Sequence, residues 1–184
     1  VKNFIIFHPS AQYLYKVYPE NLRHELLSML NALGISILVT GGPSEIDTEI
    51  KGKLKQFSNV IDAIGETSLE EYIALSELSL GYVGMDTLNM HIAATQNKRI
   101  FAIFGPTILS MWSPWSNKVN KSATKNVPIQ TYGNVTIFQA NMYCVACGNA
   151  GCEGNGKSEC LSNINPKIVF EEISNWYKNI CHLN

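Results

Sequence analysis

Residues 84–107, GMDTLNMHIAATQNKRIFAIFGPT, decide the fold of this chain. They read as the end of a strand, an acidic turn, a helix, a second apolar strand and a Gly-Pro-Thr turn. In a parallel α/β sheet, the loops that follow the strands meet at the carboxyl edge, where ligands bind. We therefore expect Asp86 and Thr87 to lie near Thr107. We also expect Asp86 to cap the helix, whose first backbone N–H groups suit a phosphate.

The same alternation of short apolar segments and helical patterns runs through the first part of the chain. Strands are expected at residues 3–8, 35–40, 59–64, 79–84 and 99–104, with helices at 19–33, 45–56, from Ser68 onward and at 87–96. Strands that alternate with helices across short loops form parallel sheets with right-handed crossovers. The pattern predicts an α/β fold with a Rossmann-like, doubly wound parallel sheet.

The remainder of the chain is less regular. Residues 108–133 read as loops with a short helix, residues 134–139 as a strand, and residues 166–182 as a helix with one apolar face. Between them lies a Cys-rich loop at 144–160. We interpret residues 1–184 as a single domain. Because the first core strand begins within three residues of the N-terminus, we expect this domain to be excised from a longer protein.

Composition excludes several classes of function. The chain is 46% apolar and 16% charged, with a net charge of −1. It has no run of like charge, and so we expect no nucleic-acid partner. No apolar stretch approaches the roughly 20 residues that a transmembrane helix needs. The glycine patterns of P-loop ATPases and of ordinary NAD-binding domains are also absent.

Polar residues follow the first two expected strands. Ser10 and Lys16 come after the first strand and could bind a phosphate, although a surface loop with a solvated lysine is the simpler interpretation. Gly42 after the second strand permits close approach to the backbone. Glu45 follows it in the first turn of a helix, where it could accept a ribose diol or be a surface residue that favours the helix dipole.

Asp86 and His91 are five residues apart around the start of the next helix. This spacing could direct both side chains into one crevice. The alternative is a capping aspartate and a histidine that faces the core.

Four cysteines form the pattern C-x2-C-x4-C-x7-C at Cys144, Cys147, Cys152 and Cys160. The loop that carries them is rich in glycine and poor in apolar residues, so we expect it to be stabilised by disulfide cross-links or by a bound metal ion. A structural zinc site is our first interpretation. Two disulfides, an iron–sulfur cluster and unligated thiols are the alternatives. We interpret Cys181 as a packed core thiol.

Over nearly all of its length the chain resembles the C-terminal domain of glycosyltransferase family 9, the ADP-heptose:lipopolysaccharide heptosyltransferases. The most specific match is the family pattern Asp-Thr-Gly-x-x-His-x-Ala-Ala, which is DTLNMHIAA at residues 86–94 here, followed by Gly-Pro-Thr at 105–107. His-Pro-Ser at 8–10 and GGPSE at 41–45 support it, and the Cys cluster also looks like a family feature. Leu88 departs from the pattern, because the family has glycine there for close approach to the donor.

The resemblance implies the donor-binding half of a GT-B enzyme. The loop with Ser10 and Lys16 would hold the donor diphosphate, Glu45 the ribose, and Thr67 would lie against the adenine. Asp86 and Thr87 would meet the sugar and phosphates. The catalytic residues would be Lys16 and Asp86, and the donor-binding residues Ser10, Gly42, Glu45, Thr67, Thr87, His91, Gly105 and Thr107.

The implied reaction is sugar transfer with inversion, in which an acceptor hydroxyl attacks the anomeric carbon as ADP leaves. Lys16 and oriented N–H groups would stabilise the leaving group without a metal cofactor. ADP-heptose would be the donor and a lipopolysaccharide core the acceptor. The general base and the acceptor site would lie in an N-terminal domain outside this chain, which would bind nucleotide but not turn over alone.

The implied location is the cytoplasm or the cytoplasmic face of the inner membrane. Two other classes stay open: a non-catalytic nucleotide- or zinc-binding module, and a fragment of a GT-B type epimerase.

Overall fold

The computed structural model describes residues 3–181, which form a seven-stranded sheet with the strand order β3-β2-β1-β4-β5-β7-β6. The strands are β1 (Phe4–His8), β2 (Ser36–Gly41), β3 (Val60–Ile64), β4 (Gly81–Met85), β5 (Arg99–Ile103), β6 (Ile129–Tyr132) and β7 (Val135–Phe138). All neighbours pair in parallel except β6, which is antiparallel to β7. The predicted Rossmann-like α/β fold is confirmed.

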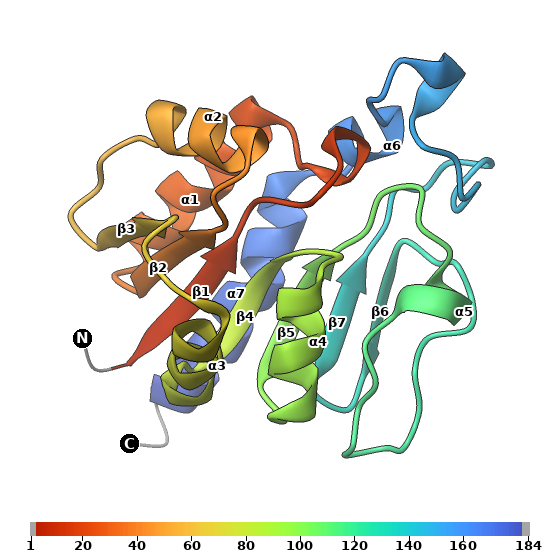
Figure 1. Cartoon of the computed structure of the whole chain (residues 1–184). Helices are drawn as coiled ribbons and strands as arrows, with labels where there is room; N and C mark the ends of the chain where they lie inside the picture. Colours follow the sequence, from red (N-terminus) through yellow and green to blue (C-terminus); the bar gives the residue numbers. More distant parts are fainter. Residues whose placement is uncertain (1–2, 182–184) are drawn as a thin grey trace.

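Helices cover both faces of this sheet (Figure 1). They are α1 (Glu20–Ala32), α2 (Glu45–Lys53), α3 (Leu69–Leu78), α4 (Leu88–Thr95), α5 (Leu109–Trp112), α6 (Glu159–Ser162) and α7 (Pro166–Cys181), with 3-10 turns η1 (Leu14–Lys16) and η2 (Cys152–Gly154). Helices α1, α2 and α7 pack on one face, and α3, α4 and α5 on the other. In the part of the chain that the structure describes, no helix is both long and apolar enough to cross a bilayer.

Strand β1 shows why two separate cores form. All five of its residues are buried, but successive side chains point to opposite faces of the sheet. Ile5 and Phe7 join the core under α1 and α7, whereas Phe4 and Ile6 join the core under α3 and α4. The near-continuous apolar strands that marked the sequence are therefore those of a sheet covered on both sides.

The structure differs from the sequence prediction in two elements, β6 and α2. Strand β6 lies in a region that we predicted as loops, because its residues IQTY show no alternation of apolar and polar side chains. In the structure Ile129 is exposed, and only Tyr132 is buried. Pairing with β7 across the tight turn at Gly133 and Asn134 creates this edge strand. Helix α2 ends at Lys53 rather than residue 56. The predicted end of the last helix at His182 lies outside the described residues.

Candidate functional site

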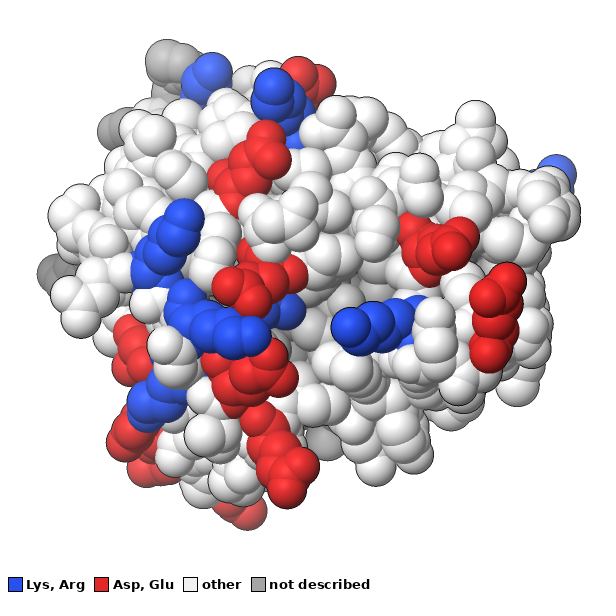
Figure 2. Space-filling view, turned by 90° about the horizontal axis from the view of Figure 1, so that it is seen from above, with Lys and Arg blue, Asp and Glu red and all other residues white. Residues whose placement is uncertain are grey.

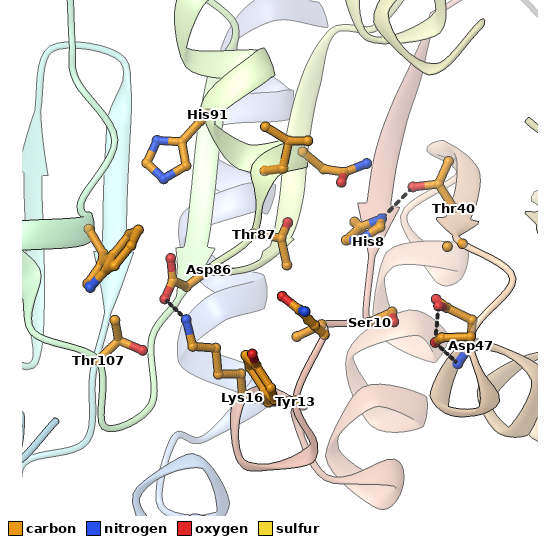
Figure 3. A pocket seen from close by; sticks show the side chains of 18 of the residues that line it. His8, Ser10, Tyr13, Lys16, Thr40, Asp47, Asp86, Thr87, His91 and Thr107 are labelled. Atoms are coloured by element: carbon orange, nitrogen blue, oxygen red, sulfur yellow. Dashed lines mark hydrogen bonds and ion pairs between the residues drawn. The ribbon is translucent and has the colours of Figure 1, made fainter. Parts of the chain in front are cut away.

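A cavity of about 1120 Å³ opens at the carboxyl edge of the sheet, among the loops that follow β1, β2, β3, β4 and β5. Figure 3 shows the polar side chains that line it: His8, Ser10, Tyr13, Lys16, Thr40, Asp47, Asp86, Thr87, His91 and Thr107. Seen from above in Figure 2, acidic and basic residues are interspersed on the surface of this side of the molecule.

An ion pair lies in the middle of this cavity. Lys16 Nζ, from the 3-10 turn after β1, is 2.9 Å from Asp86 Oδ2, just after β4. The side chains are 20% and 5% exposed, respectively. The lysine nitrogen also lies 5.7 Å from the centroid of the Trp112 ring. Asp86 and the Trp112 ring therefore hold the Lys16 side chain in place inside the cavity.

The start of helix α4 lies beside this pair. We predicted that Asp86 caps this helix, and that prediction is wrong: the N-cap is Thr87, and no side-chain hydrogen bond caps this end. The carboxylate of Asp86 is bound by Lys16 instead. The first backbone N–H groups of α4 thus stay available, as they do in anion sites at helix N-termini.

The opposite end of the cavity is built by β1, β2 and α2. His8 Nδ1 is 2.9 Å from Thr40 Oγ1, and His8 also packs against the rings of Tyr72 and Tyr82. Burial lowers the pKa of His8 to about 4, against an opposing effect of the Asp47 carboxylate. This imidazole is therefore neutral at pH 7 and contributes hydrogen bonding rather than charge.

Asp47 is a cavity residue that our reading of the sequence missed. It is 5% exposed, and its backbone N–H donates to Ser44 Oγ at 3.1 Å, while the Ser44 hydroxyl donates to Asp47 Oδ2. Its Oδ1 is buried and has no hydrogen-bond partner in the structure. The Ser-x-x-Asp spacing of a helix cap is the sequence signal that could have identified it.

Glu45 does not line the cavity. It is exposed in the first turn of α2, two residues before Asp47. Residues two apart on a helix point about 200° away from each other, so Asp47 and Glu45 cannot both face the cavity.

The other predicted site residues are mostly brought together. Ser10, Gly42, Thr67 and Thr107 all line the cavity, and the buried Thr107 hydroxyl has no hydrogen-bond partner in the structure. Gly105 is the exception. It packs under Leu161, whose Cγ would be 3.0 Å from a Cβ added there, and it shapes the turn from beneath.

His91 lines the same cavity as Asp86, from the second turn of α4. Burial lowers the pKa of His91, with Asp86 raising it and Lys16 lowering it further. The imidazole is therefore placed to respond to a change of charge at the ion pair.

The four cysteines of the loop are free thiols in the structure. Burial raises the pKa of Cys160 to about 11, and the nearby Cys152, Cys147 and Cys144 add to this shift. Among residues 3–181, however, no three His, Cys, Asp or Glu side chains are arranged so that they could hold one metal ion. A shared ion would require this loop to tighten. Cys181 is exposed on α7, which makes our prediction of a packed core thiol wrong.

Two comparisons relate the chain to curated proteins. Lipopolysaccharide heptosyltransferase 3 of Escherichia coli is 26% identical over 121 residues, which cover 64% of this chain and 36% of that protein. Lipooligosaccharide heptosyltransferase 2 of Campylobacter jejuni is 24% identical over 136 residues, which cover 74% of this chain and 37% of that protein. The alignments thus span little more than a third of these relatives.

Solved structures share the fold. The ADP-heptose lipopolysaccharide heptosyltransferase II of E. coli has a TM-score of 0.64 and 22% identity over 95% of this chain and 46% of that one. For E. coli heptosyltransferase WaaC with ADP the TM-score is 0.68 and the sequence identity is 18%, and the match covers 95% of this chain and 44% of that one. A third structure is TibC of enterotoxigenic E. coli, which is described as an iron-containing dodecameric glycosyltransferase. Its TM-score is 0.66 and its sequence identity 11%, and the match covers 98% of this chain and 46% of that one.

A family model completes the comparison. The model of glycosyltransferase family 9 (heptosyltransferase) matches residues 1–139, three quarters of the chain. The matched residues include all seven strands, β1 through β7, and both Lys16 and Asp86 of the central ion pair. This chain therefore belongs to glycosyltransferase family 9.

Proposed function

We propose that this chain is the C-terminal, donor-binding half of an inverting GT-B glycosyltransferase that moves heptose, or a related sugar, from ADP-heptose to a lipopolysaccharide core acceptor. The observation that carries the proposal is the Lys16–Asp86 pair beside the open start of α4, inside a cavity at the carboxyl edge. Family membership supports it, as do relatives named as heptosyltransferases and a similar structure that is described as containing ADP-2-deoxy-2-fluoro heptose.

The diphosphate would bind in the middle of the cavity. Lys16, Ser10 and the backbone N–H groups after Thr87 would surround it. When the bond to the sugar breaks, negative charge grows on the departing ADP, and these groups would stabilise it. Asp86 would hold Lys16 in place and meet the sugar, and His91 and Thr107 would complete this end.

The nucleoside would occupy the other end, with Thr67 against the adenine and Gly42 permitting its close approach. An acidic residue is expected for the ribose diol, and we expected Glu45. Asp47 lines the cavity, whereas Glu45 is exposed and does not line it. We therefore assign the ribose to Asp47. Asp47→Asn should weaken ADP binding, while Glu45→Gln should leave the affinity unchanged.

The remaining parts of the enzyme would lie outside this chain. The alignments cover 36% of one relative and 37% of the other, so the general base and the acceptor site have room in another domain. Because the core acceptor is carried on a lipid, we place the activity at the cytoplasmic face of the inner membrane.

We further propose that Cys144, Cys147, Cys152 and Cys160 hold a structural metal ion, with zinc as the first choice. Their C-x2-C-x4-C-x7-C spacing supports the proposal. Metal analysis of the purified protein, combined with a count of reactive thiols, tests it. One bound metal per chain is expected, and two disulfides without metal would contradict it.

Calorimetric titration of ADP, with UDP and GDP as controls, tests the main proposal. ADP should bind, and Lys16→Ala should weaken its binding roughly ten- to hundredfold, because a hydrogen bond to a charged group contributes about 1.5–3 kcal/mol. Lys55→Ala, an exposed lysine outside this cavity, is the matched control. Equal affinity for the three nucleotides, or an unchanged affinity of Lys16→Ala, would refute the assignment.

A further inference from the structure

The Cys-rich loop reaches the cavity that we assign to the donor. Gly148 and Asn149 lie between Cys147 and Cys152 in sequence, and both line the cavity. The backbone N–H of Gly148 donates to the carbonyl oxygen of Pro106 at 2.8 Å. In Figure 1 the segment between β7 and α6 rises over the carboxyl ends of the strands. The loop is thus part of the cavity wall as well as a candidate metal site.

Contacts on the far side of the loop hold it against the sheet. Leu161 is 1% exposed and packs on Gly105. Gly105 directly precedes Pro106, which accepts the hydrogen bond from Gly148. The hydroxyl of Tyr18 donates to the carbonyl oxygen of Ile164 at 2.5 Å. The segment that follows the loop is therefore fastened to the body of the domain, and the hydrogen bond from Gly148 to Pro106 holds the residue next to Asn149.

Asn149 lies at a definite end of the cavity. Figure 3 shows Thr107 at one end, Thr40 and Asp47 at the other, and the Lys16–Asp86 pair between them. The hydrogen bond between Gly148 and Pro106 places Asn149 at the Thr107 end. With the nucleoside at the Asp47 end and the diphosphate at Lys16, the Thr107 end is left for the sugar.

We propose that Asn149 is a further donor-binding residue, whose carboxamide hydrogen-bonds the hydroxyl groups of the transferred sugar. This inference rests on the proposed function. A carboxamide both donates and accepts, which matches a sugar hydroxyl. Asn149 is exposed, lines the cavity and has no hydrogen-bond partner among the described residues, so its side chain is available to a ligand. The Cys loop would then contribute to donor selection.

Calorimetry with two ligands tests the inference. Asn149→Ala should weaken ADP-heptose binding roughly two- to tenfold, the effect of one hydrogen bond, and leave ADP binding unchanged. Asn141→Ala is the matched control, since Asn141 is exposed on the preceding segment and does not line the cavity. Thermal unfolding of all three proteins should coincide, because neither side chain is buried.

Amide hydrogen exchange gives a second readout that needs no variant. ADP-heptose should slow exchange in a peptide around Gly148 and Asn149 more than ADP does, whereas the exposed segment 117–121 should be unaffected.

The outcomes separate the two proposals. If ADP binds but Asn149→Ala behaves like Asn141→Ala and the loop exchanges equally with both ligands, the role of Asn149 is refuted and the donor site stands. An equal loss of ADP and ADP-heptose affinity would refute the assignment to the sugar. If ADP does not bind the wild-type chain, the proposed function fails and the role of Asn149 fails with it.

Discussion

The buried histidine at the end of β1 should make the stability of this protein depend on pH. His8 is 6% exposed, and burial lowers its pKa from 6.5 to about 4. In the unfolded chain the imidazole takes up a proton near its ordinary pKa, so between about pH 6.5 and 4 the unfolded state binds more protons than the folded state. The free energy of unfolding must therefore fall as the pH is lowered through this window.

The size of this effect follows from the two pKa values. The difference between 6.5 and about 4 corresponds to about 3 kcal/mol at full protonation, because one pKa unit is about 1.4 kcal/mol. The loss should begin below about pH 6.5 and stop growing below about pH 4. It is a large fraction of the 5–15 kcal/mol that is typical of a folded domain.

The assay is urea unfolding of the wild type and of His8→Asn at several pH values between 4 and 7.5. Asparagine has no charge to gain, and its amide can take the place of Nδ1 beside Thr40. Burial also lowers the pKa of His91 and of His24, so the measured quantity is the difference in unfolding free energy between the two proteins, in which their contributions cancel. That difference should shift by about 3 kcal/mol in favour of the variant from pH 7 to pH 4. A difference that does not change with pH would refute the reasoning.

Three substitutions test the packing around the cavity, each by urea unfolding at pH 7. Asp86→Asn should lower the unfolding free energy by about 1–3 kcal/mol, because it removes the negative charge that faces Lys16 in a mostly buried pair, and no change would contradict the importance of this charge for stability. Gly105→Ala should cost about 1–3 kcal/mol by pushing a Cβ against Leu161, whereas Gly52→Ala, where a Cβ meets nothing, should not destabilise. Ser68→Ala should cost about 1 kcal/mol through loss of the capping box at α3, and an unchanged midpoint would show that the cap contributes nothing.

The fold was largely predictable because its signals are local. Each expected strand of the first 107 residues exists, and the apolar runs of β1, β4 and β5 are those of strands that are buried on both faces. Helix α3 begins where Ser68 and the acidic residues after it predicted, with a full capping box to Glu71. Strand β6 was not predicted because its own residues carry no apolar alternation. It forms at the edge of the sheet through backbone pairing with β7, and that pairing is not visible in the residues of β6.

The site was only partly predictable, because its geometry joins distant segments. The types of residue at the strand ends predicted a cavity, and Ser10, Thr67 and Thr107 do line it. Nothing in the sequence shows that Lys16 would meet Asp86, 70 residues away, and prevent it from capping α4.

The succession of strands and helices along the chain, the burial of both faces of the sheet and the edge where a ligand can bind were all predictable from the residues alone. Each of these follows from periodicity and from the rule that parallel strands end together. By contrast, the lining of the cavity by Asp47 instead of Glu45, and by Asn149 of the Cys loop, became visible only in the folded chain. The reason is that the direction of a side chain depends on helix phase and on where a loop docks, and both are set by packing between segments far apart in the chain.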